Sequence, residues 1–146
     1  MKLISHRGNV NGKTNLENNP EHIKKILLDY NYDVEIDVWF QNNNYYLGHD
    51  EPTFIITKKF LYEFNNRLWC HCKNINTLFE LKDEFNCFWH QNDDYTLTSK
   101  GYIWVYPGKK LIKNSIALFD NYTDKELELC YGICSDNIIK YIGKIY

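Results

Sequence analysis

The chain is poor in arginine and has no long apolar segment. Only two of its 17 lysine and arginine side chains are arginines, Arg7 and Arg67, and the net charge is −2. No excess of basic side chains therefore points to a nucleic-acid partner. No apolar run approaches the roughly 18 residues of a transmembrane helix, so we expect no membrane span. Met1-Lys2 leads directly into a short apolar run instead of a signal peptide, and we expect a cytoplasmic protein.

Cysteine offers no framework for disulfides. The five cysteines are odd in number and include no Cys-x-x-Cys pair. Cys70, His71 and Cys72 are consecutive, which suggests a zinc site, but a strand would send the two thiols to one face and the imidazole to the other. Buried free thiols are the simpler interpretation in a cytoplasmic protein.

Linkers, internal repeats and low-complexity segments are also missing from the sequence. A length of 146 residues then predicts one domain, residues 1–146, that can bury a substantial core. Hydrophobic residues make up 44% of the chain, which in so short a protein is compatible with a homo-oligomer.

The segment 34–38 (VEIDV) is the most informative local pattern. In a strand, its three apolar side chains point to one face, and Glu35 and Asp37 point to the other. Two carboxylates that face a pocket repel each other, and a divalent cation such as Mg²⁺ or Ca²⁺ relieves that repulsion. The alternative is an ordinary surface strand with a solvated acidic face, which shows the same alternation.

Two histidines stand at the ends of short apolar runs. His6 follows residues 2–5 and His49 follows residues 45–47, and each has a glycine and a charged residue close by. Two imidazoles can act as general base and general acid near neutral pH. Arg7 directly follows His6, and its planar guanidinium suits bidentate phosphate binding. A purely structural role for each histidine is the alternative interpretation.

Together these pieces resemble the glycerophosphodiester phosphodiesterase family, within the superfamily of phospholipase-C-like phosphodiesterases. The family pattern runs His-Arg-Gly, Glu-Asn, Glu-x-Asp-Val and His-Asp. The chain has these motifs in this order at residues 6–8, 17–18, 35–38 and 49–50. Residues 132–136 (GICSD) also resemble the closing strand of that family. The resemblance implies an unusually short member.

Periodicity and capping signals predict alternating strands and helices. Pro20 suits the first turn of a helix, and Glu126 stands at the capping-box position after Thr123. We expect helices over residues 20–30, 57–64, 76–85 and 123–129. We expect strands over residues 2–5, 33–40 with an extension at 45–47, 67–73, 87–90, 95–98, 103–106, 115–119 and 133–136.

Eight strands that alternate with helices predict a parallel sheet. The resemblance implies that this α/β sheet closes into a compact (β/α)8 TIM-type barrel. Such barrels usually need about 200 residues or more, so several helices must be shortened or missing. An open α/β sheet is the alternative. In such a barrel the active site lies at the carboxyl ends of the strands, where His6, Asp37 and His49 are expected.

The resemblance also assigns roles to individual residues. His6 and His49 are the expected catalytic pair, and Glu35 and Asp37 are expected to bind the metal. The expected substrate-binding residues are Arg7, Lys73 and Glu17, with Asn18 bracing the pocket.

One position departs from the family pattern. The third strand usually carries Glu-x-Lys, whereas this chain has His71 two residues before Lys73. The family implies Mg²⁺ or Ca²⁺, but an imidazole ligand at His71 favours Mn²⁺ or Zn²⁺. His90 has no counterpart in the family pattern; it either lines the pocket or packs in the core.

The expected activity is metal-dependent hydrolysis of a small-molecule phosphodiester, a glycerophosphodiester or a related diester. The mechanism that the resemblance implies is acid–base catalysis by two histidines. One alternative is a catalytically inactive barrel that binds a phosphorylated ligand, favoured by the missing third carboxylate. The other is a different metal-dependent hydrolase or lyase, acting on phospholipid or nucleotide head groups.

Overall fold

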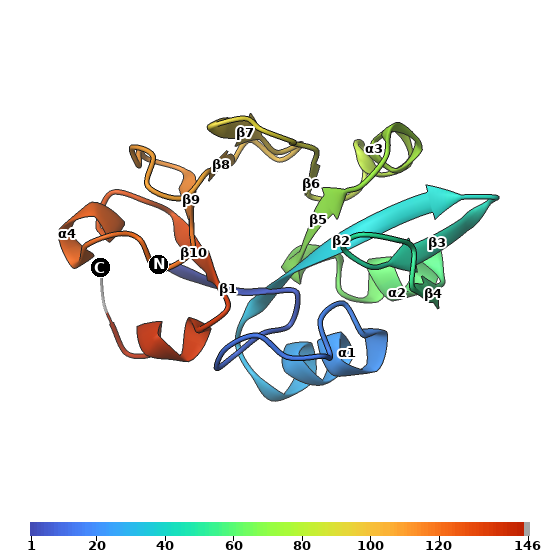
Figure 1. Ribbon diagram of the computed structural model, residues 1–146, viewed down its shortest axis with the longest axis horizontal. Helices are drawn as coiled ribbons and strands as arrows, with labels where there is room; N and C mark the ends of the chain where they lie inside the picture. The colour runs from blue at the N-terminus through green and yellow to red at the C-terminus, as the bar shows by residue number, and fades with distance from the viewer. Residues whose placement is uncertain (145–146) are drawn as a thin grey trace.

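The chain folds around one strongly curled sheet of ten strands, with its helices on the outer side (Figure 1). The computed structural model describes residues 1–144. The helices are α1 (Pro20–Asp29), α2 (Lys58–Glu63), α3 (Ile75–Leu81) and α4 (Asp124–Leu127), with 3-10 turns η1 (Asn65–Arg67) and η2 (Ile138–Tyr141). The strands are β1 (Lys2–His6), β2 (Asp33–Gln41), β3 (Asn44–Leu47), β4 (Phe54–Ile56), β5 (Leu68–Cys72), β6 (Cys87–Phe88), β7 (Tyr95–Leu97), β8 (Ile103–Val105), β9 (Ser115–Leu118) and β10 (Gly132–Ser135).

Strand β1 lies in the middle of the sheet and pairs in parallel with β2 and with β10. Beyond β2 the parallel order continues through β5 to β6, and beyond β10 it continues through β9 to β8. The β3–β4 hairpin and the strand β7 are antiparallel additions. Because the central strands are parallel, their carboxyl ends meet at one edge of the sheet.

The sheet does not close, so the expectation of a (β/α)8 barrel is wrong. Within residues 1–144, β6 pairs with β5 alone, and neither β7 nor β8 pairs with it. The loop after β7 reaches β6 through a backbone bond from Ser99 N to Cys87 O (2.8 Å), without strand pairing. Of the described helices only α1 and α3 have seven or more residues. A chain of this length cannot supply eight crossover helices, and an open half-barrel results.

Most of the expected elements exist, but their bounds and pairing differ. The helix expected over residues 76–85 ends at Leu81, and the last helix is a single turn whose capping box joins Thr123 and Glu126. Residues 45–47 do not extend the strand at 33–40. They turn back as β3, after a loop in which Asn42 and Asn43 both have positive φ. Strand β4 is not among the elements expected from the sequence.

The alternation of side chains along the strands produces two hydrophobic cores. The outer core joins α1 to the apolar face of β2, including Ile23, Val34 and Ile36. The inner core lies within the curve of the sheet and consists of Ile4, Trp69, Phe88, Trp104, Ile116, Leu118 and Cys134. The acidic face of β2 therefore points inward, which excludes the solvated surface strand.

The thiols of Cys70 and Cys72 lie in the outer core as free cysteines. His71 faces the other side of β5, so these three residues do not form a zinc site. Among residues 1–144, no helix combines the length and hydrophobicity needed to cross a membrane.

Candidate active site

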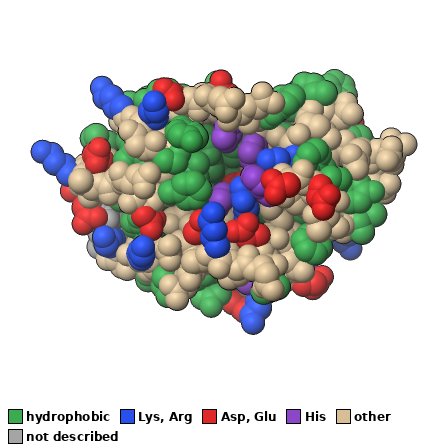
Figure 2. Space-filling model, viewed as in Figure 1, with side chains coloured by type: hydrophobic (Ala, Val, Ile, Leu, Met, Phe, Trp, Pro, Cys, Tyr) green, Lys and Arg blue, Asp and Glu red, His purple; other side chains and the backbone are tan. Residues whose placement is uncertain are grey.

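The carboxyl ends of β1, β2 and β5 bring the predicted site residues together. His6 pairs in register with Glu35, and Asp37 pairs in register with His71. Register partners on parallel strands share a face, so all four side chains point into the curve of the sheet. In Figure 2, histidine, basic and acidic side chains gather in the middle of this face, beside a hollow bordered by hydrophobic side chains.

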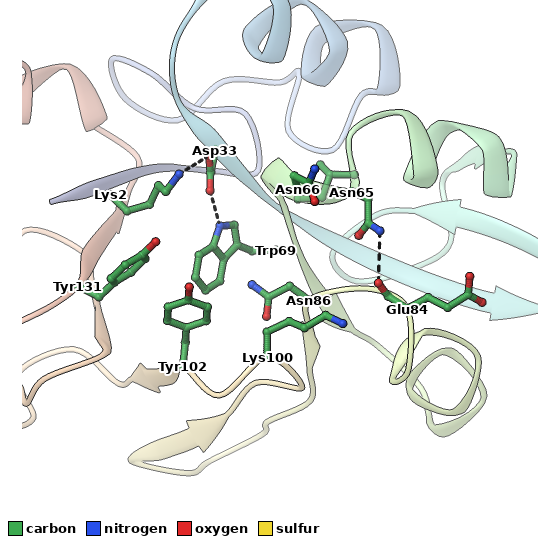
Figure 3. Close-up of a pocket in the computed structure, with 11 residues that line it drawn as sticks. Lys2, Asp33, Asn65, Asn66, Trp69, Glu84, Asn86, Lys100, Tyr102 and Tyr131 are labelled. Carbon is green, nitrogen blue, oxygen red and sulfur yellow. Dashed lines mark hydrogen bonds and ion pairs between the residues drawn. The ribbon is translucent and has the colours of Figure 1, made fainter.

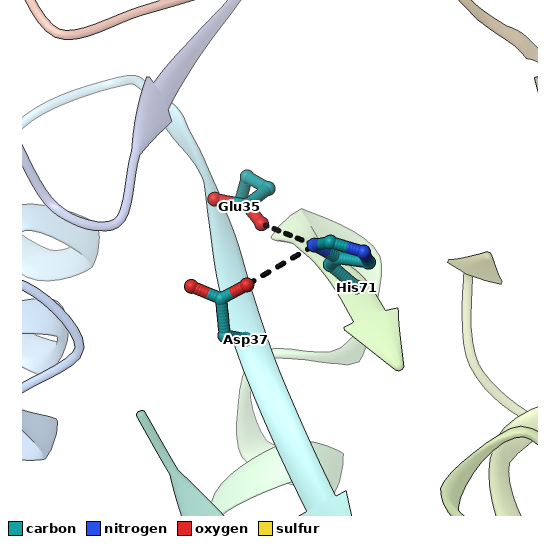
Figure 4. Close-up of side chains that lie close together, drawn as sticks. All are labelled: Glu35, Asp37 and His71. Atoms are coloured by element: carbon teal, nitrogen blue, oxygen red, sulfur yellow. Dashed lines mark ion pairs between the residues drawn. The ribbon is translucent and has the colours of Figure 1, made fainter. Parts of the chain in front are cut away.

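Glu35, Asp37 and His71 form a compact group of ligand atoms (Figure 4). His71 Nδ1 lies 3.0 Å from Asp37 Oδ1 and 3.9 Å from Glu35 Oε1. One ligand atom from each residue falls within 4.8 Å of the other two. Both carboxylates are almost completely buried, Glu35 at 2% and Asp37 at 0% exposed. Burial of two negative charges costs free energy unless a partner compensates them.

One buried carboxylate oxygen stands out within residues 1–144. Glu35 Oε2 has no hydrogen-bond partner among these residues and lies 3.8 Å from His6 Nε2. Asp37 Oδ1, by contrast, lies 3.0 Å from His71 Nδ1 and 3.5 Å from Lys73 Nζ. Two buried carboxylates beside an imidazole nitrogen are suited to a divalent cation, and the imidazole makes Mn²⁺ or Zn²⁺ a better fit than the Mg²⁺ or Ca²⁺ that the resemblance implies.

The pKa values of the Glu35 and Asp37 carboxyl groups shift in opposite directions. Burial, and then the negative charge of Asp37, raise the pKa of Glu35 well above its usual value. Burial also acts to raise the pKa of Asp37, but the His71 hydrogen bond and the Arg7 charge outweigh it, so that pKa falls well below its usual value. Without a cation, the cluster therefore has one firmly ionised carboxylate and one that is held back from ionising.

Asp37 is held from several directions. Asn18 donates from Nδ2 to Asp37 Oδ2 (2.9 Å) and accepts from the Asp37 backbone N–H (2.9 Å). Arg7 Nε lies 3.0 Å from Asp37 Oδ2, and Lys73 Nζ lies 3.5 Å from Oδ1. Glu17 contacts the other end of the guanidinium, with its Oε2 3.3 Å from Arg7 Nη1. The predicted phosphate-binding and metal-binding residues thus form one network.

The local backbone explains why the first motif has this composition. Arg7 and Asn18 have φ of 54° and 58°, and the Asn18 N–H bonds the Arg7 carbonyl (3.1 Å). These are left-handed conformations, which cost energy for a residue such as arginine and indicate a constrained site. Gly8 has φ of 87°, and a Cβ there would lie 2.8 Å from Ile23. The glycine lets α1 pack directly under the His-Arg turn.

His6 is oriented by a residue from the far end of the chain. Its Nδ1 lies 2.7 Å from Oδ1 of Asp136, and Asn9 Nδ2 donates to the same oxygen (2.8 Å). Neither Asp136 nor Asn9 has a role that the sequence patterns predict. The sequence signal that could have indicated this contact is the motif at residues 132–136, because it overlaps strand β10, which pairs with β1.

His49 is brought to the rim of the site and not into the buried cluster. Its side chain is 41% exposed, and its Nδ1 lies 2.7 Å from Asp50 Oδ1. It lines a cavity of about 360 Å³ together with His71, Lys73 and His90. The second expected catalytic histidine is therefore far more exposed than the Glu35 and Asp37 carboxylates.

His90 both packs and lines this cavity, so the two alternatives for it are not exclusive. Its ring stacks on His71 with centroids 4.7 Å apart, and Phe88 stacks on the same imidazole at 5.2 Å. Among residues 1–144, its buried Nδ1 has no hydrogen-bond partner. Burial, followed by the nearby charges of His71 and Lys73, lowers the pKa of His90 to about 4.

This pKa predicts how stability depends on pH. Between about pH 6.5, where an unfolded histidine titrates, and about pH 4, the unfolded chain binds a proton at His90 that the folded chain does not. The free energy of unfolding should therefore fall as pH drops through this window. In His90→Phe, which keeps the stacked ring but does not titrate, that part of the loss should disappear. Urea unfolding of both proteins from pH 4.5 to 7.5 measures it, and parallel curves would contradict the assignment.

Comparison with protein-family models, curated proteins and solved structures gives no match for this chain. The motifs and the geometry of the site are therefore the features from which a function can be inferred.

Proposed function

We propose that the chain is a divalent-metal-dependent phosphodiester hydrolase that acts on glycerophosphodiesters or related phosphate diesters. The observation that carries the proposal is the pair of buried carboxylates, Glu35 and Asp37, that lie beside the His71 imidazole and near the cationic side chains of Arg7 and Lys73. A site that combines anionic metal ligands with two cationic side chains suits a phosphate bound to a metal.

Glu35, Asp37 and His71 are the residues that would hold the cation. When bound, the cation would polarise a phosphoryl oxygen as a Lewis acid and stabilise the charge that develops on it. Among the groups of the chain itself, Arg7 is available for the other oxygens. Its side chain is 15% exposed, and Glu17 and Asp37 hold the guanidinium in place. Lys73, 16% exposed, adds a second positive charge at the same edge.

His6 suits the role of general base. If its Nδ1 carries the hydrogen that bonds Asp136, then Nε2 has the free lone pair and faces the carboxylate cluster. Nε2 would take the proton from the attacking hydroxyl, which belongs to water or to a neighbouring group of the substrate. That oxygen forms the new bond to phosphorus as the bond to the leaving oxygen breaks. His49, at the rim, would give a proton to the leaving alkoxide.

A second candidate function is binding of a phosphorylated ligand without turnover. The exposure of His49 and its pairing with its sequence neighbour Asp50 favour this candidate. A general acid that is not fixed by the surrounding fold is poorly oriented for catalysis.

The test is hydrolysis by the purified protein of glycerophosphodiesters and of an activated aryl phosphodiester, with Mg²⁺, Ca²⁺, Mn²⁺ or Zn²⁺ in turn. We expect turnover that a chelator abolishes and that the ion restores, with Mn²⁺ or Zn²⁺ more effective because of His71. No turnover with any ion, from protein that circular dichroism shows to be folded, would reject the hydrolase and favour the binding function.

A further inference from the structure

An aromatic side chain packs against the inner core at each of its two ends. Tyr102, which precedes β8, contacts Trp69 at the amino-terminal end, with ring centroids 5.0 Å apart (Figure 3). Phe119, which follows β9, packs against the same core at the carboxyl end, where the candidate active site lies. The ring of Phe119 meets the imidazole of His6 edge to face, with centroids 5.0 Å apart and planes at 88°. Phe119 is therefore a direct contact of the proposed general base, and none of the sequence motifs includes it.

The position of the Phe119 ring does not follow from the alternation of side chains along β9. Ile116 and Leu118 face the inner core, and Ala117 faces the outer core. One more extended residue would send the next side chain to the outer core with Ala117. Instead the Phe119 backbone has φ of 62°, and its side chain packs on the inner core. The left-handed backbone thus brings the ring back to the side of the sheet that carries His6.

A separate set of hydrogen bonds holds this backbone conformation. A left-handed φ is unfavourable for a bulky residue, and such strain persists only where the surrounding structure imposes it. The Phe119 N–H bonds the Cys134 carbonyl of β10 (2.8 Å). The next side chain, Asp120, accepts at Oδ1 from Ser135 Oγ (2.6 Å) and from Tyr141 OH (3.1 Å). These bonds tie the turn after β9 to β10 and η2.

The Phe119 ring adds a third contact to the imidazole of His6. Asp136 lies 2.7 Å from Nδ1, and Glu35 lies 3.8 Å from Nε2. The bond that joins an imidazole to its side chain has a broad torsional preference, so one hydrogen bond at one nitrogen leaves the ring free to turn. A second ring that stands perpendicular to the imidazole opposes this rotation. The strained turn after β9 therefore acts on the orientation of His6.

From these contacts we propose that Phe119 is a positioning residue for His6. Its ring keeps the imidazole turned so that Nδ1 faces Asp136 and Nε2 faces the carboxylate cluster. The inference rests on the proposed function for the role of His6 as general base, whereas the positioning itself can be measured without turnover. The strained backbone at Phe119 is the cost of placing the ring on the inner side of the sheet.

Three variants of Phe119 separate the effect of the ring from that of the strained backbone. Phe119→Ala and Phe119→Gly should both lower kcat about tenfold, as expected when a reacting group is no longer held in place, with little change in KM. Phe119→Gly should nevertheless melt about 3 °C above Phe119→Ala, because glycine adopts a positive φ without penalty. Phe119→Tyr keeps the ring and should keep the wild-type kcat.

Nuclear magnetic resonance of the full chain measures the positioning directly. Long-range ¹H–¹⁵N spectra at about pH 8.5, roughly two units above the pKa of free histidine, give the fraction of His6 that carries its hydrogen on Nδ1. We expect a high fraction in the wild type and in Phe119→Tyr. The fraction should fall in Phe119→Ala and Phe119→Gly, because the imidazole is no longer held with Nδ1 at Asp136.

Phe60→Ala is the matched control. Phe60 is also a partly buried phenylalanine with a ring contact, to Phe64 at 5.7 Å between centroids, but it lies on α2 and packs against the outer core. Its replacement should lower the melting temperature and leave both kcat and the Nδ1–H fraction of His6 unchanged.

The proposal is overturned if Phe119→Ala keeps the wild-type Nδ1–H fraction, or if Phe60→Ala lowers that fraction as much. Wild-type kcat in Phe119→Gly would also overturn it, because the ring would then be dispensable. A wild-type protein without turnover would reject the proposed hydrolase, and the Nδ1–H fraction would still decide whether Phe119 positions His6.

Discussion

Replacing His6 by alanine is expected to lower kcat for phosphodiester hydrolysis by about 10³-fold, within the range for loss of a general acid–base group. The reason is geometric. His6 is the histidine that the fold holds on both sides, with Nδ1 2.7 Å from Asp136 and Nε2 3.8 Å from Glu35. KM should change much less than kcat, because the substrate phosphate is expected to contact Arg7 and Lys73. Steady-state kinetics with the metal-loaded protein measures both constants.

Two further variants make this prediction specific. Asp136→Asn should give a kcat between those of the wild type and His6→Ala, because the imidazole remains but its orientation and tautomer are no longer fixed. His22→Gln is the control. His22 lies on α1, where its Nε2 contacts the Gly8 carbonyl at 3.0 Å, and glutamine can keep that hydrogen bond. A His6→Ala protein that is folded and retains wild-type kcat would exclude His6 as the base.

Adding Mn²⁺ or Zn²⁺ to the metal-free protein is expected to raise its melting temperature by about 5–10 °C when the ion is present at 100 times its dissociation constant. The cation would compensate the charges of two buried carboxylates, Glu35 and Asp37. In Glu35→Gln this shift should be lost. The metal-free variant should itself melt above the wild type, because burial of the Glu35 carboxyl next to Asp37 opposes its ionisation.

Glu17→Gln is the matched control for this experiment. Glu17 is also an acid of the site, but it contacts Arg7 and Asn9 and lies outside the proposed ligand group, so its variant should keep the metal-induced shift. His71→Glu should move the preference toward Mg²⁺ or Ca²⁺, because oxygen replaces nitrogen as the third ligand. An unchanged shift in Glu35→Gln would show that the ion binds elsewhere.

The open sheet shows where sequence patterns fail as predictors of fold. Alternation and capping are local, and they correctly indicated α1, α2 and the strands that carry the site. Closure of a barrel is not local. Closure depends on whether β6 pairs with β8. The short strand β7, which precedes β8 in the chain, pairs with β8 in the antiparallel sense. An open α/β sheet, the alternative to the barrel in the sequence-based expectations, is closer to the observed fold.

The candidate site shows the same division between local sequence patterns and contacts that only the tertiary structure creates. The sequence by itself determined that Glu35 and Asp37 share one face of a strand, because side chains alternate along any strand. It also placed His6, Asp37 and His49 at or near strand ends. Only the tertiary structure brought Asp136 to His6, 130 residues away in the chain, and buried Glu35 Oε2 without a hydrogen-bond partner among residues 1–144. Local patterns follow from backbone geometry, whereas these contacts depend on how parallel strands curve around a shared interior.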